Sequence, residues 1–328
     1  MLGLAFGLLL PKALAAAEPP SPAQSIDQLA ALLSDVTKAT AHRYAARDDR
    51  GRTLDCLKIF ELAPGDYLGI YHTMEKRVFR LHAAQSTNLL DWYHRVELDA
   101  HASQGALWRE KAGGFYLAYE HDVPKAVNIR LRHYADLPAL LNGRFDREVD
   151  LPRTLAPTAE GTPSFERVEE GNSPDQSRID LRIHYYREMQ VDRAARGTLV
   201  GFTNWSATVE PAINAALGAK GVQGNIGDRD HVEFQGRPWL IQEGQLIRNE
   251  WSSWRLFLLD PPASLCRELH IHTHRGSTSF ANPSVTRLRD PQGRWVYAVT
   301  LFLPTQGNAR GEVGSLIYLV ADPSVPSR

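Results

Sequence analysis

Carboxylates gather in one short stretch of the sequence. The triplet Asp228-Arg229-Asp230 follows a glycine-rich loop and begins a short strand, and Glu243 lies near the end of the next strand. A hairpin of this kind brings the start of its first strand beside the end of its second. Paired carboxylates are the minimal equipment for general acid–base catalysis. We therefore take Asp228, Asp230 and Glu243 as catalytic candidates.

The alternation of side chains along a strand refines this prediction. Asp228 and Asp230 should point together and Arg229 away from them, because successive strand residues face opposite sides. A guanidinium nearby lowers the pKa of a carboxyl, which favours a base or a sugar ligand over a general acid. The alternative is an internal ion pair that only holds the strand start in place.

A second pair of acids, Glu120 and Asp122, lies at the end of the strand that begins at Phe115. Two like charges on one strand face raise the pKa of one of them, as an acid catalyst requires. Glu120 is therefore a fourth catalytic candidate. A solvated strand end is the alternative for this pair, and a surface acid is the alternative for Glu243.

Three histidines, His270, His272 and His274, alternate along another expected strand. Histidines at period two can bind zinc, but no second cluster of ligands accompanies them, so we predict no metal site. His274 instead faces the substrate site in the interpretation that we prefer.

The elements that must position these residues are strands in a repeating order. From Thr53 onward strand signals recur with turns between them, in five groups about 50–60 residues apart. The second strand of a group is aromatic, as in 67–71, 115–119 and 295–299. Four strands per unit at this period are typical of a β-propeller, whereas a β-sandwich with long loops is the alternative.

A propeller would bring residues from all five groups to one mouth. The start of each first strand and the end of each second strand open on the same face of the ring. The expected mouth holds acids, amides and histidines, which suit a polyhydroxylated ligand. The predicted substrate-binding residues are Arg229, His72, Gln104, Asp122, Gln245, His274, Asn282 and Glu312.

The N-terminal part is expected to lie outside this repeat. Residues 1–17 have an apolar run followed by small residues and predict a signal peptide, so we expect a secreted or periplasmic protein. Residues 18–52 should form a linker and a helix over about 25–44, with Ser25 and Gln28 as a capping box, packed outside the propeller of residues 53–328. One further helix is expected over Val209–Leu217.

Composition restricts the partners. The 328 residues carry a formal net charge of -1, which provides no general attraction for nucleic acid. The N-terminal apolar run is too short to span a bilayer, and we expect a monomer. The two cysteines, Cys56 and Cys266, are expected to be buried free thiols, with a disulfide between them as the alternative.

Three segments carry a resemblance to a known family: 225–243, 113–120 and 282–298. In these segments and in the fivefold repeat, the chain resembles the five-bladed β-propeller glycoside hydrolases, the clans that contain families 43, 62, 32 and 68. The resemblance implies an all-β fold of five blades. It also implies an axial Asp as base or nucleophile, a Glu as acid and a further Asp that tunes the acid.

Asp228 and Asp230 match axial positions of that family, and Glu120 or Glu243 matches the acid. The first group has no clear Asp motif where the family places its base, and Asp55 is the candidate there. No cofactor is expected, although the resemblance leaves a Ca²⁺ ion near the axis as an option.

The leading hypothesis is a glycoside hydrolase that acts on an oligo- or polysaccharide. Asp230 and Glu243 are the preferred catalytic residues, and Asp228 and Glu120 are the next candidates. The alternatives are a non-catalytic glycan-binding propeller with the same mouth and, third, a protein-interaction propeller.

Overall fold

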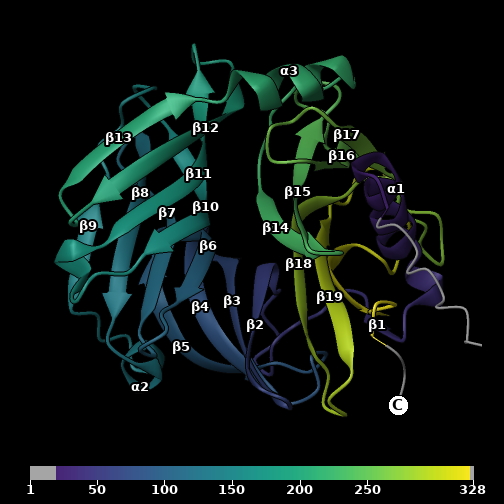
Figure 1. Ribbon diagram of the computed structural model, residues 1–328, viewed down its shortest axis with the longest axis horizontal. Coiled ribbons are helices and arrows are strands. Elements are labelled where there is room, and N and C mark those ends of the chain that lie inside the picture. The colour runs from purple at the N-terminus through teal and green to yellow at the C-terminus, as the bar shows by residue number, and fades with distance from the viewer. Residues whose placement is uncertain (1–19, 326–328) are drawn as a thin grey trace, which may run out of the picture.

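A computed structural model describes residues 20–325, whose twenty strands form five four-stranded antiparallel sheets. The sheets are the blades of a ring, with the first strand of each blade near the centre (Figure 1). The all-β, five-bladed propeller expected from the sequence is confirmed. The signal peptide expected at residues 1–17 lies outside the described residues.

Blades I to IV follow the chain, and each is ordered from the axis outward. Blade I is β2 (Asp55–Ala63), β3 (Asp66–Glu75), β4 (Val78–Ser86) and β5 (Tyr93–Ala100). Blade II is β6 (Ala102–Arg109), β7 (Phe115–Val123), β8 (Ala126–Tyr134) and β9 (Arg147–Asp150). Blade III is β10 (Glu160–Glu169), β11 (Arg178–Arg187), β12 (Val191–Val200) and β13 (Asn204–Val209). Blade IV is β14 (Arg229–Phe234), β15 (Arg237–Gln245), β16 (Trp254–Leu259) and β17 (Cys266–Leu269).

Blade V closes the ring with strands from both ends of the chain. Its order is β18 (Ala281–Arg289), β19 (Trp295–Leu303), β20 (Gly314–Ala321) and β1 (Ala41–Arg43). Ala41 pairs with Leu319 and Arg43 with Ile317. The prediction of a helix through residue 44 is therefore wrong, and the propeller includes residues before Thr53.

The N-terminal helix α1 (Pro22–Leu33) is shorter and begins earlier than expected. Ser21 is its cap and forms the capping box with Gln24, so the predicted box of Ser25 and Gln28 is wrong; Ser25 is buried. Ile26, Leu29 and Leu33 pack into the core shared by blades IV and V. The helix lies outside the ring beside β16 and β17, as expected (Figure 1).

Other helices are few. The helix expected over Val209–Leu217 is α3 (Pro211–Ala219), which begins two residues later, and α2 (Leu137–Leu141) follows β8. Three short 3₁₀ turns complete the elements: η1 (Val36–Lys38), η2 (Pro174–Gln176) and η3 (Trp251–Ser253). None of the helices within residues 20–325 is long and apolar enough to cross a membrane.

Four of the five innermost strands carry a β-bulge at the same place. The register of each shifts just after its first or second pair, and the bulge contains a residue in the left-handed region, which is uncommon for side chains other than glycine. We call these the bulge residues: Cys56 (φ 53°), Gln104 (φ 52°), Thr162 (φ 44°) and Asn282 (φ 49°). The bulges lie at the strand starts and therefore shape the mouth.

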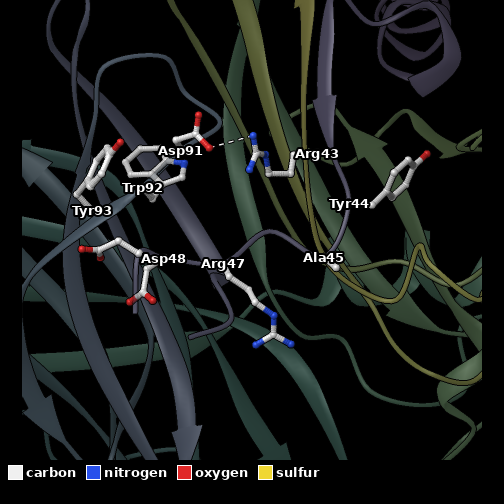
Figure 2. A pocket seen from close by; sticks show the side chains of 9 residues that line it. Arg43, Tyr44, Ala45, Arg47, Asp48, Asp91, Trp92 and Tyr93 are labelled. Atoms are coloured by element: carbon white, nitrogen blue, oxygen red, sulfur yellow. Dashed lines mark ion pairs between the residues drawn. The ribbon is translucent and has the colours of Figure 1, made fainter. Parts of the chain in front are cut away.

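A groove of about 480 Å³ marks the place where the ring closes. Figure 2 shows the Arg43–Asp91 ion pair between its two sides, with an N···O distance of 2.9 Å. Asp48, whose side chain is fully buried, accepts hydrogen bonds from the Tyr71 hydroxyl (2.6 Å) and from the backbone N–H groups of Arg50 (2.9 Å) and Arg52 (2.8 Å). The segment that follows β1 is thus fixed to blade I by one carboxylate.

Replacing Asp48 with alanine should lower the free energy of unfolding by about 3 kcal/mol, because it leaves a buried hydroxyl and two N–H groups without their acceptor. The matched control is Arg43→Ala, which removes an exposed ion pair and should cost less than about 1 kcal/mol. Urea unfolding of both variants measures this. Equal losses would contradict the role given to Asp48.

Candidate functional site

The mouth is built from one type of contact between neighbouring blades. A side chain near the end of a second strand accepts the backbone N–H of the bulge residue in the next blade; we call this contact a blade lock. Nδ1 of His72 accepts the N–H of Gln104 at 3.2 Å, joining blades I and II. Glu120 accepts the N–H of Thr162 at 2.7 Å and joins blades II and III.

The third blade lock is formed by Glu243. One of its carboxyl oxygens accepts the N–H of Asn282 and joins blades IV and V. The other accepts the N–H of Asp228 at 2.7 Å. A Cβ atom at Gly227 would overlap this carboxyl, so the glycine-rich loop before β14 is needed for Glu243 to reach inward.

Polar side chains from four blades meet at the axis. Asn282 Nδ2 donates to Asp55 Oδ1 at 2.8 Å, and Gln104 Nε2 donates to Asn282 Oδ1 at 3.3 Å. His72 Nε2 lies 3.5 Å from Asp55 Oδ2. We call Asp55, His72, Gln104, Glu243 and Asn282 the mouth cluster. The predicted mouth residues His72, Gln104 and Asn282 are therefore brought together with Glu243.

Asp228 lies next to the mouth cluster but is closed off from solvent, with 2% of its surface exposed. Its carboxylate is 2.9 Å from Lys58 Nζ and 3.1 Å from the Cys56 thiol. Burial alone would lower the pKa of Lys58, but the Asp228 charge outweighs it and holds this pKa above its ordinary value. The internal ion pair weighed from the sequence is present, with Lys58 in place of Arg229.

Arg229 holds two blades together. It is 1% exposed, and its guanidinium donates to the carbonyls of Thr162 (2.8 Å) and Gly227 (2.6 Å) and to the Gln242 side chain (3.0 Å). The guanidinium has no hydrogen bond to the Asp228 carboxylate; it lines an axial cavity together with Asp230, whereas strand alternation predicts that these two neighbours face opposite sides. These contacts join blades III and IV and leave Arg229 no exposed surface for a substrate.

Glu243 is held in an environment that favours its protonated form. Burial, followed by the charge of Asp228, raises its pKa to about 8, although the two backbone N–H donors act in the opposite direction. Only 4% of the residue is exposed. Glu243 therefore carries a proton at neutral pH.

Asp230 lies one layer deeper along the axis than Asp228. Its carboxylate accepts hydrogen bonds from the Ser284 hydroxyl (2.5 Å) and from the N–H groups of Val285 (3.2 Å) and His231 (2.8 Å). It borders an axial cavity instead of the mouth cluster. The two leading catalytic candidates, Asp230 and Glu243, thus share no hydrogen-bond partner.

Glu120 and Asp122 lie together at the end of β7. The Glu120 carboxyl accepts the hydroxyls of Thr162 (2.6 Å) and Ser103 (3.1 Å) in addition to its blade lock. Burial, followed by the charge of Glu120, raises the pKa of Asp122. The like-charge effect expected from the sequence is therefore present, and it acts on Asp122.

Three predicted substrate-binding residues form other contacts. Gln245 is 3% exposed and bonds to the backbone of Asn249 and Glu250. Glu312 is 1% exposed and accepts the hydroxyls of Thr273 and Ser277. His274 is 3.2 Å from the Tyr44 hydroxyl and stacks on His42. None of the hydrogen bonds found for these three residues joins them to the mouth cluster.

The described residues were also compared with what a metal site or a disulfide would need. Within residues 20–325 no group of three or more His, Cys, Asp and Glu side chains could hold a metal ion. A Ca²⁺ ion does not fit beside Asp228, because this carboxylate is already paired with an ammonium group. Both cysteines are free thiols; Cys56 is buried as expected, whereas Cys266 is only partly buried.

Sequence reasoning missed Lys58 and Thr162. Lys58 lies within the apolar run 57–60, and a lysine at such a place is rarely buried without a partner. Its position therefore indicated a buried ion pair. Thr162 had no such signal, because its role depends on backbone conformation.

Comparisons with known proteins support the architecture. No family model matches the sequence, and no curated protein matches it. Solved structures do match. The fold is that of the five-bladed glycoside hydrolases. A chain described as a glycoside hydrolase is 10% identical with a TM-score of 0.61, covering 94% of this chain and 99% of its own. A thermostable family-43 glycoside hydrolase gives 0.53 at 10% identity, covering 84% and 92%.

A third structure carries a ligand. The α-L-arabinanase of Cellvibrio cellulosa complexed with arabinohexaose is 10% identical with a TM-score of 0.50, covering 81% of this chain and 91% of its own. The resemblance in fold that the sequence suggested is thus confirmed at low identity.

Glu243 should make the stability of the protein fall as the pH rises. Its pKa is about 8 in the folded state and near the ordinary 4.5 when unfolded, so the stabilisation present below about pH 4.5 is lost as the pH rises to about 8. The loss should be about 4 to 5 kcal/mol. In Glu243→Gln, which cannot ionise, this slope should be absent.

Urea unfolding across this pH range measures the slope. The control is Glu169→Gln, which replaces a glutamate whose side chain is 53% exposed and should keep the wild-type slope. Identical slopes in the wild type and Glu243→Gln would show that Glu243 is not held protonated.

Proposed function

We propose that the mouth cluster binds an oligosaccharide and that the protein hydrolyses a glycosidic bond there. The observation that carries the proposal is the position of Asn282, which donates its side-chain amide to Asp55 and its backbone N–H to Glu243. Two hydrogen bonds and the span of one asparagine limit the separation of these carboxyls to roughly 10 Å. Hydrolysis of a glycoside requires two carboxyls within about this distance.

The two carboxyls have the properties that the two roles require. Glu243 holds a proton at neutral pH and is assigned the general acid, which protonates the leaving oxygen. Asp55 has a side chain 20% exposed and is assigned the second carboxylate, which activates water or attacks the sugar. Asp55, a secondary candidate from the sequence, thus replaces Asp230 as the proposed partner of Glu243.

Substrate binding is assigned to the amides of the mouth cluster. Gln104 Oε1 is buried and has no hydrogen-bond partner among the described residues, which leaves an acceptor for a sugar hydroxyl. An arabino-oligosaccharide is the first probe, because the Cellvibrio arabinanase of the same fold was solved with arabinohexaose. The signal-like N-terminus supports a secreted or periplasmic enzyme, which we propose to act as a monomer.

A non-catalytic glycan-binding propeller is the second candidate. It is favoured because the acids already have partners within the protein. Both Glu243 oxygens accept backbone N–H groups, and Asp228 is paired with Lys58. In this alternative the acids serve only to join the blades, and the mouth binds sugar without cutting it.

The test is a glycan panel that includes arabinohexaose, assayed for both binding and release of reducing ends. Asp55→Asn and Glu243→Gln should each lower kcat by about 10²- to 10⁴-fold while binding is kept. The control Glu169→Gln should leave kcat unchanged. Binding without release in the wild type would select the glycan-binding alternative, and release that survives in both variants would contradict the proposed carboxyl pair.

A second substrate separates acid catalysis from structural damage. A dinitrophenyl glycoside has a leaving group that needs no protonation, so Glu243→Gln should cut it nearly as well as the wild type does. A loss as large as that on arabinohexaose would assign Glu243 a structural role only.

A further inference from the structure

A polar cavity lies on the axis, beyond the layer of Asp228 and the mouth cluster. It has a volume of about 180 Å³ and is lined by residues from the first strands of all five blades. Lys58 and Arg229 line its end nearest the mouth. Residues further along the innermost strands line the rest of it. The cavity therefore lies deeper along the axis than the mouth cluster.

Three of the residues that line the cavity are aromatic. Phe60, Trp108 and Phe165 come from blades I, II and III, and the Trp108 and Phe165 rings lie 6.2 Å apart between centroids. Phe60 and Trp108 are partly exposed, so the cavity has access to solvent along these side chains. Aromatic faces of this kind pack against the C–H surfaces of sugars and other small rings.

Two buried polar groups of the cavity lining are left without partners. The hydroxyl of Ser164, a residue only 4% exposed, has no hydrogen-bond partner among the described residues, and neither does Nε1 of Trp108. Buried polar groups are nearly always hydrogen-bonded, so each orphan needs an explanation. A ligand that accepts from the indole N–H and bonds to the serine hydroxyl would satisfy both.

The charges around the cavity exclude an anionic ligand. All three N–H bonds of the Lys58 ammonium are used, by the Asp228 carboxylate and by the carbonyls of Arg229 and Pro283. Asp230 adds a carboxylate to the lining, which repels anions and accepts hydroxyl donors. The cationic groups next to the cavity likewise disfavour a cation. A neutral ligand rich in hydroxyl groups remains.

We propose that this axial cavity is a binding site for one neutral monosaccharide, separate from the mouth cluster. The volume equals that of about six water molecules in the liquid, which suits a single sugar ring. The aromatic walls cover the ring, Asp230 and Ser164 bond to its hydroxyls, and Trp108 donates to a ring or hydroxyl oxygen. The proposal does not depend on hydrolysis at the mouth.

The experiment measures binding of L-arabinose and D-glucose by saturation-transfer NMR and by quenching of tryptophan fluorescence. The wild type should show saturable binding. Ser164→Ala, and Trp108→Phe, which keeps the aromatic ring and removes the N–H donor, should each weaken it by about tenfold. The control is Trp251→Phe, which replaces an exposed tryptophan and should leave the affinity unchanged. Asn282→Ala is measured beside it as the mouth variant and shows whether the sugar is taken up at the mouth cluster.

A crystal of the wild type soaked with L-arabinose gives a second measurement that needs no variant, and sugar between Trp108 and Asp230 is the expected result. Absence of saturable binding, or binding lost in Asn282→Ala and kept in Ser164→Ala and Trp108→Phe, would overturn the proposal. Release of reducing ends from arabinohexaose is measured separately, so failure of this site and failure of the proposed hydrolysis are distinguishable.

Discussion

The arrangement of the mouth depends on backbone N–H groups that the β-bulges remove from the strand ladder. Such an N–H needs an acceptor, because a buried donor without a partner is costly. In three places the neighbouring blade supplies it from the end of its second strand, through His72, Glu120 or Glu243. Residue types that can catalyse reactions are thus also the ones that join the blades.

This double use of the side chains explains why Glu243 and Asp55, both near the axis, differ in how deeply they are buried. Glu243 takes part in a blade lock, so it is buried next to Asp228 and retains its proton. Asp55 takes part in none and keeps a partly exposed carboxyl group. Asn282 connects the two through its backbone and its side chain. A proton donor and a partly exposed carboxyl group can therefore lie side by side, although the same contacts limit the surface that Glu243 offers to a substrate.

Part of this arrangement can be predicted from the sequence. The meeting of Asp228 and Glu243 follows from antiparallel pairing, and the approach of His72, Gln104 and Asn282 follows from the fivefold repeat. The ring closure does not, because Ala41–Arg43 is too short to show a period and pairs with residues near the other end of the chain. The partner of Asp228 was also missed, since Lys58 is 170 positions away and only the closed ring brings the two together.

The proposed hydrolysis places one sugar of an oligosaccharide between Asp55 and Glu243 in the mouth cluster. A crystal structure of the Glu243→Gln variant with arabinohexaose would show whether the substrate lies there. We expect a glycosidic oxygen within hydrogen-bond distance of residue 243, with Asp55 close to the adjoining sugar and Gln104 or Asn282 bonded to its hydroxyls. A chain of sugars bound elsewhere on the propeller, with the mouth cluster unchanged, would contradict it.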